Sequence, residues 1–294
     1  MIPNFLIVGA PKCGTTAMWR YLHQHPQIHL SQRKDLHYFG SDLTFLKRQR
    51  FSKDEYHSHF DNTDEIAIGE ASVWYLYSQN AAKEIFEYNP NMKIIIMLRD
   101  PVQMIYAHYT QMKFNGLGDE DLSTFEEALQ AEPARKEGRR IPKHCPLACT
   151  LFYREIAKVA TQIERYLEIF PKEQILFLFQ EDMKTNMKEL YINTLQFLEV
   201  SEEFTPEFER VNTHKEVRFE TLRKIIGKTP QGLKDRIPKR PRKILSKTIR
   251  KYNSKHAERM KLSPETDKML RFELTEEISR LEEICQRDLT HWKV

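Results

Sequence analysis

The sequence predicts an α/β fold, in which a P-loop-like parallel β-sheet carries helices on both faces and a helical C-terminal extension follows. Short apolar runs rich in branched side chains alternate with longer segments of helical spacing, which is typical of parallel strands joined by crossover helices. The first apolar run leads through a glycine-containing loop into a helix, the order of a phosphate-binding unit. We therefore expect one domain over residues 1–294, with an α/β core at 1–200 and a helical, basic extension at 201–294.

The individual strands and helices follow from these patterns in chain order. Continuous apolar runs indicate strands buried on both faces, and these runs are Asn4–Val8, a shorter Ile66–Ile68, Ile94–Leu98 and Ile175–Phe179. Helical spacing covers Thr15–His25, Gln79–Tyr88, Val102–Phe114, Phe125–Ala131, Leu151–Phe170 and Asn186–Leu198. Prolines interrupt the pattern beyond Glu199, where we expect helices and loops without strands.

Charge is distributed unevenly along the 294 residues, although the net charge is only +4. Residues 223–261 hold 15 Lys/Arg and 2 Asp/Glu, a local +13, so the rest of the chain carries −9. A basic cluster identifies no partner by itself. The apolar residues interleaved with it favour a solvated amphipathic helix or lid over a contact with donor or acceptor, and nucleic acid is the least favoured partner.

Several classes of protein are disfavoured by composition. No run approaches the ~20 apolar residues of a membrane span, and the first apolar run lacks the preceding basic region of a signal peptide. We expect a cytoplasmic protein without a membrane partner, and the sequence leaves its oligomeric state open. Four cysteines are too few for a disulfide scaffold, and Cys145 and Cys149 lack the second pair or nearby histidine of a zinc site. No metal is expected.

The loop from Gly9 to Thr16, with the sequence GAPKCGTT, has the features of an anion site. Backbone amides and the positive end of the following helix would face a phosphate, with Lys12 adding a mobile charge and two threonine hydroxyls completing the cradle. A nucleotide triphosphatase loop would instead need a lysine where Thr15 stands. A nucleotide kinase or another triphosphate enzyme is therefore the less favoured alternative.

Four segments in order resemble the sulfotransferases that use 3′-phosphoadenosine-5′-phosphosulfate (PAPS), and in particular a bacterial branch similar to the heparan-sulfate-type N-deacetylase/N-sulfotransferase enzymes. They are Phe5–Thr16, Lys34–Phe39, Ile68–Ser72 with Tyr75 and Leu76, and Leu98–Val102 with His108 and Tyr109. They span about the first 110 residues. Residues 163–200 resemble the family more loosely. The resemblance implies PAPS as donor, 3′-phosphoadenosine-5′-phosphate (PAP) as product, and no metal.

The resemblance also assigns roles to residues. The residues implied to hold the donor's 5′-phosphosulfate are Pro11, Lys12, Cys13, Gly14, Thr15, Thr16 and Lys34. Arg99 is implied to hold the 3′-phosphate, with Arg218 as a further basic candidate.

Catalysis requires charge neutralisation at the leaving phosphate and a base for the acceptor. Lys12 is the candidate for the first role, and the resemblance places the base at Glu70, with His37 and His108 in reserve. From the residues alone, Glu70 could equally be a loop residue or helix cap, and either histidine could be structural.

Some positions depart from the family pattern. Met104 and Ala107 stand where the family usually has an arginine and a serine, which weakens the implied 3′-phosphate site. Ala71 replaces a lysine of the heparan-type enzymes, which indicates an acceptor less anionic than a sulfated glycan. We expect sulfuryl transfer to a hydroxyl or amine of a small natural product. A glycan acceptor and a catalytically idle nucleotide- or nucleic-acid-binding module remain alternatives.

One aromatic cluster lies close to Glu70 in the sequence. Trp74, Tyr75 and Tyr77 could line a pocket for a flat acceptor or pack in the core.

Overall fold

The protein was analysed as a computed structural model, which describes residues 2–45, 50–61, 63–115, 119–143, 145–209, 215–217, 254–256 and 262–294. A five-stranded parallel sheet in the order β2-β3-β1-β4-β5 forms its centre. The strands are β1 (Phe5–Gly9), β2 (Ile28–Leu30), β3 (Ala67–Ala71), β4 (Lys93–Leu98) and β5 (Ile175–Phe179). The predicted α/β class with a parallel sheet is confirmed.

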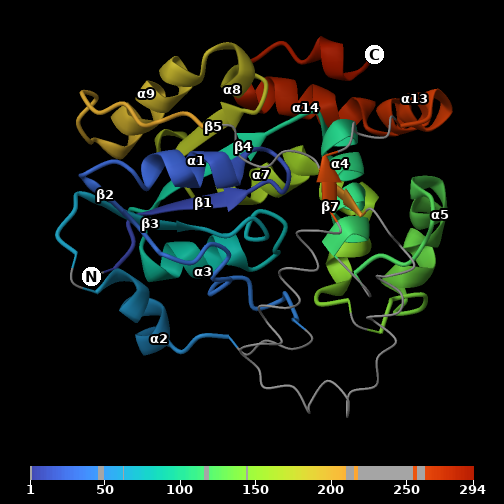
Figure 1. Ribbon diagram of the computed structural model, residues 1–294, viewed down its shortest axis with the longest axis horizontal. Coiled ribbons are helices and arrows are strands. Elements are labelled where there is room, and N and C mark those ends of the chain that lie inside the picture. Colours follow the sequence, from blue (N-terminus) through green and yellow to red (C-terminus); the bar gives the residue numbers. More distant parts are fainter. Residues whose placement is uncertain are drawn as a thin grey trace.

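Helices cover both faces of this sheet, which explains why the residues of its central strands are buried. Every residue of β1 and β3 is buried. In Figure 1, α1 and α9 lie above the strands and α3 lies below them. The helices of the first 200 residues are α1 (Thr15–Leu22), α2 (Lys53–His57), α3 (Ala81–Tyr88), α4 (Pro101–Asn115), α5 (Phe125–Lys136), α6 (Tyr153–Ala157), α7 (Val159–Leu167), α8 (Asp182–Thr185) and α9 (Met187–Leu198).

The weakest predicted strand, Ile66–Ile68, is present but longer than predicted. Strand β3 begins at Ala67 and continues through Gly69 and Glu70 to Ala71. A Cβ on Gly69 would lie 2.5 Å from the Phe5 carbonyl oxygen, so this glycine permits close pairing with β1 and does not end the strand. The edge strand β2 was not predicted, because its three residues include a histidine and make no apolar run.

Two predicted helices also differ from the structure. The segment Leu151–Phe170 divides into α6 and α7 at Lys158, whose ψ of 64° is not helical. Gln162 Nε2 donates to the Glu155 and Ile156 carbonyls at this break, replacing part of the lost helical bonding. Helix α5 continues past Ala131 through Pro133.

The proline is tolerated because the carbonyl four residues earlier has another donor. Pro133 has no N–H for Leu129, and Arg154 Nη1 donates to the Leu129 carbonyl at 3.0 Å. A second contact of α5 is a buried pair, in which Arg135 donates to both oxygens of Glu120 at 2.8 Å. Long-range contacts therefore set the length of α5.

The C-terminal part contains the expected helices but also strands. Helices α13 (Pro264–Glu273) and α14 (Thr275–Cys285) are present, whereas the absence of strands beyond Glu199 was predicted wrongly. Strands β6 (Lys215–Val217) and β7 (Ser254–His256) pair antiparallel. These strands are short and largely polar, so the sequence has no apolar run that would predict them. Arg218 and most of the basic stretch 223–261 lie outside the described residues.

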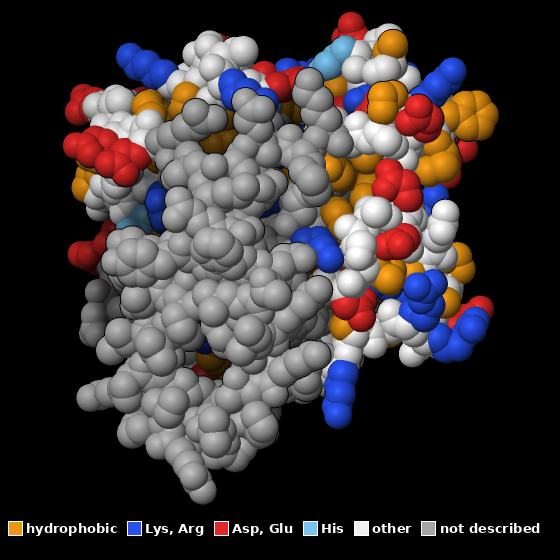
Figure 2. Space-filling view, turned by 45° about the vertical axis from the view of Figure 1, so that its right-hand side comes forward, with side chains coloured by type: hydrophobic (Ala, Val, Ile, Leu, Met, Phe, Trp, Pro, Cys, Tyr) orange, Lys and Arg blue, Asp and Glu red, His pale blue; other side chains and the backbone are white. Residues whose placement is uncertain are grey.

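Side-chain contacts attach the C-terminal helices to the core. Arg271 of α13 donates to Asp100 at 3.1 Å, immediately before α4. Arg287 lies 4.0 Å above the Phe179 ring and pairs with Asp182. These helices lie along the top of Figure 1 near the C-terminus. Figure 2 shows a face turned by 45° from this view, on whose described part acidic, basic and apolar side chains are interspersed.

Candidate active site

The predicted anion loop joins the carboxyl end of β1 to α1. Gly14 is the N-cap of α1 with φ +95°, and no side chain of the described residues caps this helix. The first amides of a helix have no partner within the helix, so those of Thr15 and Thr16 are available to an anion near its positive end. The Ala10 amide donates to the Met97 carbonyl at 2.8 Å and fixes the loop against β4.

Two basic side chains that follow different strands, Lys12 after β1 and Arg99 after β4, lie close together at this loop. Lys12 Nζ donates to Gln111 Oε1 on α4 at 2.6 Å, and Arg99 Nη1 donates to the Lys12 carbonyl at 3.4 Å. Arg99 follows β4 directly, and its neighbour Asp100 accepts from the Val102 amide at 2.9 Å. This carboxylate cap, together with the contact from Arg271, holds the turn that carries Arg99.

The remaining loop residues differ in what they can offer a ligand. Pro11, Cys13 and Thr15 are buried, and Thr16 is half-buried. Burial raises the pKa of the Cys13 thiol to about 12, against the nearby charges of Arg99 and Lys12. Cys13 is therefore a neutral packing residue, and only its backbone could contact an anion.

Replacing Gly14 with alanine is expected to lower the free energy of unfolding by about 1–2 kcal/mol, the cost of a left-handed conformation for a residue with a side chain. The new Cβ would also lie 2.5 Å from Met183 Sδ, although this flexible side chain can move. Urea unfolding measures the loss. Gly138→Ala is the control for the contact with Met183, since Gly138 also has a positive φ, +78°, but open space around its Cβ position. An unchanged free energy of unfolding in Gly14→Ala would contradict the expected strain.

Glu70 lies inside β3, one residue before its end, and not beyond the strand as predicted. Its side chain is fully buried. Oε1 accepts hydrogen bonds from Tyr75 at 2.6 Å and Tyr56 at 3.3 Å, and Oε2 accepts one from Ser72 at 2.6 Å. Burial raises the pKa of Glu70 to about 7, and the three hydroxyls oppose this rise. The carboxyl group is thus poised to exchange a proton near neutral pH.

The segment Lys34–Phe39 is joined to the end of β3. The Asp35 amide donates to the Ala71 carbonyl at 2.8 Å, and the His37 amide donates to Ser72 Oγ at 3.0 Å. Lys34 Nζ lies 3.3 Å from Asp35 Oδ1. The structure therefore brings both Lys34 and His37 to the strand that carries Glu70, with the His37 ring packed 4.8 Å from that of Phe45.

The reserve candidate His108 has a structural environment. It is buried on α4, and its Nε2 lies 2.8 Å from the Thr150 carbonyl oxygen, which can only accept a hydrogen bond. Burial lowers the pKa of His108 to about 4, so the ring is neutral at physiological pH.

The aromatic cluster of residues 74–77 belongs mainly to the core. Tyr75 is fully buried and Trp74 is 8% exposed. Arg165 donates to the Leu76 and Tyr77 carbonyls. Of the two interpretations left open by the sequence, core packing describes Trp74 and Tyr75.

Two residues of the site were missed by sequence reasoning. Tyr56 reaches Glu70 from α2, and its ring is stacked 3.9 Å from that of Tyr38. Gln111 holds Lys12 from α4. Neither belongs to a recognisable motif, because each is brought to the site by tertiary packing.

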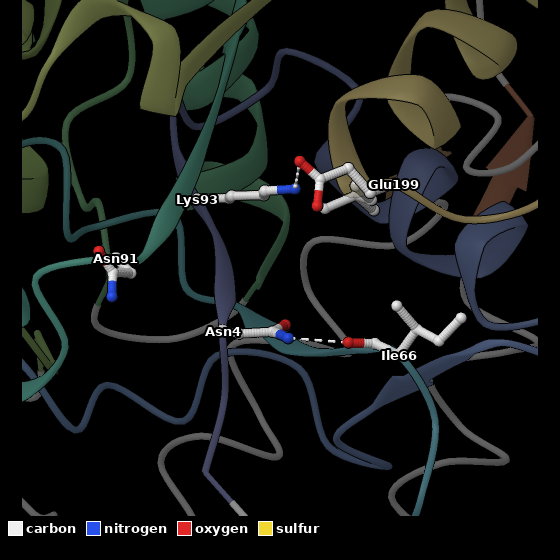
Figure 3. Close-up of a pocket in the computed structure, with 6 residues that line it drawn as sticks. Asn4, Ile66, Asn91, Lys93 and Glu199 are labelled. Carbon is white, nitrogen blue, oxygen red and sulfur yellow. Dashed lines mark hydrogen bonds and ion pairs between the residues drawn. The ribbon is translucent and has the colours of Figure 1, made fainter.

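A small pocket of about 160 Å³ lies at the other edge of the sheet. Asn4 precedes β1, Ile66 precedes β3 and Lys93 begins β4, so it is at the amino ends of the strands (Figure 3). Lys93 Nζ pairs with Glu199 there at 3.1 Å. Open α/β sheets bind ligands at the carboxyl ends, where the loop and Glu70 are found.

Within the described ranges, no group of three or more His, Cys, Asp or Glu side chains could hold a metal ion. No helix of that part of the chain is long and apolar enough to cross a membrane.

A family model described as "Sulfotransferase domain" matches residues 3–293. A crystal structure of a sulfotransferase from Alicyclobacillus acidocaldarius superposes with a TM-score of 0.75 and 26% sequence identity, and the match covers 100% of both chains.

Curated relatives are similar over about two thirds of the chain. Human bifunctional heparan sulfate N-deacetylase/N-sulfotransferase 3 is 29% identical over 210 residues, which are 68% of this chain and 22% of that protein. Mouse carbohydrate sulfotransferase 15 is 26% identical over 249 residues, which are 67% of this chain and 44% of that protein. The chain thus matches less than half the length of these relatives.

Proposed function

The chain belongs to the sulfotransferase domain family, and from this premise we propose that it transfers the sulfuryl group of PAPS to a hydroxyl or amine of a small-molecule acceptor. One observation carries the proposal. The loop that ends at Gly14, the N-cap of α1, has Lys12 and Arg99 beside it and lies at the same edge of the sheet as the buried Glu70 carboxylate. We further propose that residues 1–294 form a single sulfotransferase domain.

The donor side follows from the loop. PAPS supplies an activated sulfuryl group, whose transfer breaks its S–O bond to the 5′-phosphate, forms a bond from sulfur to the acceptor, and releases PAP and a proton. Amides at the start of α1 and the ammonium of Lys12 would neutralise the charge left on the 5′-phosphate. Lys34 is a second candidate cation on this side. The left-handed Gly14 at the N-cap of α1 supports this fit, because no side chain of the described residues caps the first amides of the helix.

Arg99 would bind the 3′-phosphate without the family's usual neighbours. Met104 and Ala107 are buried and have no polar side-chain group to offer a phosphate. Part of this site must therefore come from elsewhere, and Arg218 stays the basic candidate.

The acceptor's proton would pass to Glu70. A base has to be ionised before it can accept a proton, and a carboxyl with a pKa of about 7 is partly ionised at neutral pH. Because Glu70 is fully buried, the acceptor hydroxyl must replace one of its three hydroxyl donors. The bond from Tyr56, at 3.3 Å, is the longest of the three and the easiest to replace. His37, in the adjacent segment Lys34–Phe39, stays the reserve candidate for the base.

Acceptor class is inferred from the side chains near the carboxylate. The aromatic rings of Tyr56, Tyr38 and Phe39 pack together there, and Ala71 adds no charge. These neighbours favour an uncharged, partly apolar acceptor over a polyanionic glycan. An assay that offers a phenol, an amine and a desulfated glycan in parallel separates the alternatives.

Calorimetric titration tests the donor assignment. We expect PAP to bind without a metal and more tightly than ATP with magnesium. Transfer of radiolabelled sulfate from PAPS to the probe acceptors should then be detected. Preferential binding of ATP with magnesium would contradict the proposal and favour a triphosphate enzyme.

A further inference from the structure

The hydrogen bonds to Glu70 differ in how firmly their donors are held. Ser72 and Tyr75 both donate at 2.6 Å, one to each carboxylate oxygen, whereas Tyr56 donates at 3.3 Å. Each strong donor also lies within five residues of Glu70 on the same chain segment. The carboxylate is therefore fixed by two short bonds from its own strand end and one longer bond from α2.

Backbone amides orient the two strong donors. The His37 amide donates to Ser72 Oγ at 3.0 Å, and the Tyr38 amide donates to the Tyr75 hydroxyl at 2.7 Å. A backbone N–H can only donate, so each hydroxyl oxygen acts as the acceptor of that bond. Its own proton is then directed to the Glu70 carboxylate.

On the basis of the proposed function, we propose that Ser72 and Tyr75 are positioning residues, which keep the buried Glu70 carboxylate ionised and oriented for proton transfer. Neither hydroxyl has to contact the donor or the acceptor. Each acts through the hydrogen bond it makes to Glu70, and the segment Lys34–Phe39 supports both through its backbone.

The surroundings show why such support is needed. Burial raises the pKa of Glu70, the hydroxyls of Ser72 and Tyr75 lower it most, and the negative charge of Asp35 raises it again. Lys34 pairs with Asp35 and offsets part of that charge. Burial raises the pKa of Tyr56 and of Tyr75 well above the usual value, so both phenols keep their protons as donors.

Around these groups lie two further titratable rings. The His37 ring lies 6.4 Å from that of Tyr75, and the Tyr88 ring lies 6.1 Å from that of Tyr56. Burial also raises the pKa of Tyr88. Tyr88 is therefore uncharged near neutral pH, and the charge that faces Glu70 comes mainly from Asp35.

Difference infrared titration of the 294-residue chain tests the inference without any ligand. The carbonyl stretch of protonated Glu70 is identified by its loss in Glu70→Gln. Removing one hydrogen bond to a charged group should raise the titration midpoint by roughly one pH unit in Tyr75→Phe and in Ser72→Ala. Tyr56→Phe should give a smaller rise because its bond is longer.

Tyr153→Phe is the matched control. Tyr153 is also buried and donates at 2.8 Å to a buried carboxylate, that of Glu120, so the substitution removes the same kind of bond elsewhere. The infrared titration midpoint of Glu70 should be unchanged in Tyr153→Phe. If Tyr75→Phe and Ser72→Ala, both folded by circular dichroism, also keep the wild-type midpoint, the inference is wrong.

Activity gives a second readout. With the acceptor found in the transfer assay, the acid limb of kcat/KM should move upward in Tyr75→Phe, with about tenfold less activity below the midpoint and recovery at high pH. A pH-independent loss would indicate a merely structural role and overturn the inference. A shifted infrared midpoint with full activity in Glu70→Gln would instead refute Glu70 as the base, while the control of its ionisation by Ser72 and Tyr75 would stand.

Discussion

Glu70→Gln is expected to reduce sulfate transfer at least ~100-fold, the scale of general-base catalysis, while PAP binding stays unchanged. Glutamine has nearly the same shape, and its carbonyl can accept a hydrogen bond where the carboxylate did. It cannot take a proton from the acceptor. Calorimetry with PAP and single-turnover transfer from PAPS measure the two effects separately.

The pH dependence of the wild-type protein belongs to the same prediction. A base acts when it is ionised, and burial raises the pKa of Glu70 to about 7. Transfer should therefore increase as the pH rises through about 7 and level off above it. This acid limb should disappear in Glu70→Gln, because glutamine has no carboxyl group whose ionisation could change the residual rate.

Glu84→Gln provides a control near the same aromatic cluster. Glu84 accepts hydrogen bonds from the Gly40 and Ser41 amides at 2.7 and 2.9 Å, so its role is to hold a loop. Transfer in this variant should stay close to wild type.

Turnover that is unaffected by Glu70→Gln would exclude Glu70 as the base.

Arg135→Met is expected to lower the free energy of unfolding by about 3–5 kcal/mol, because it leaves a buried carboxylate without its cation. Arg135 and Glu120 have fully buried side chains joined by two bonds of 2.8 Å. Burial alone would raise the pKa of Glu120, but hydrogen bonds from Arg135, the Leu122 amide and Tyr153 outweigh burial and lower it. Urea unfolding at neutral pH measures the loss.

The exposed pair of Arg139 and Glu137 is the matched control. Their side chains are 69% and 63% exposed, and such pairs contribute little. Arg139→Met should change stability by less than about 1 kcal/mol. The pKa of Glu120 is lowered in the folded state, so the contribution of the buried pair is lost as the pH falls through that lowered value. The difference between wild type and Arg135→Met should accordingly shrink in acid, and a constant difference would argue against an electrostatic origin.

The loop from Gly9 to Thr16 and the strand before Arg99 could be predicted from the sequence because each depends on a short, local pattern. The loop from Gly9 to Thr16 carries its strand, its glycines and its helix within a dozen residues, and Arg99 follows an unmistakable apolar strand. Local patterns of this kind determine local geometry. The structure places Arg99 Nη1 3.4 Å from the Lys12 carbonyl oxygen, and the donor contacts assigned to the two residues stay predictions.

The carboxylate half could be predicted only in part. Glu70 was proposed through the resemblance, but the strand before it was predicted to end at Ile68, whereas Gly69 allows the strand to continue beside Phe5. Tyr56 reaches the carboxylate from a helix 14 residues away in sequence, and this contact depends on packing that no motif encodes. The donor contribution predicted for Arg218 lies outside the described residues, so it stays a prediction.

The position of β1 has a consequence for how the chain folds. It is the first strand made, yet it lies at the centre of the sheet, between strands that begin at Ala67 and Lys93. Parallel neighbours cannot form by hairpin closure, and such long-range pairing slows folding. During synthesis, β1 must wait for about 90 further residues to emerge before both of its edges are covered. We expect the first strand to be the segment most in need of protection from aggregation on the ribosome.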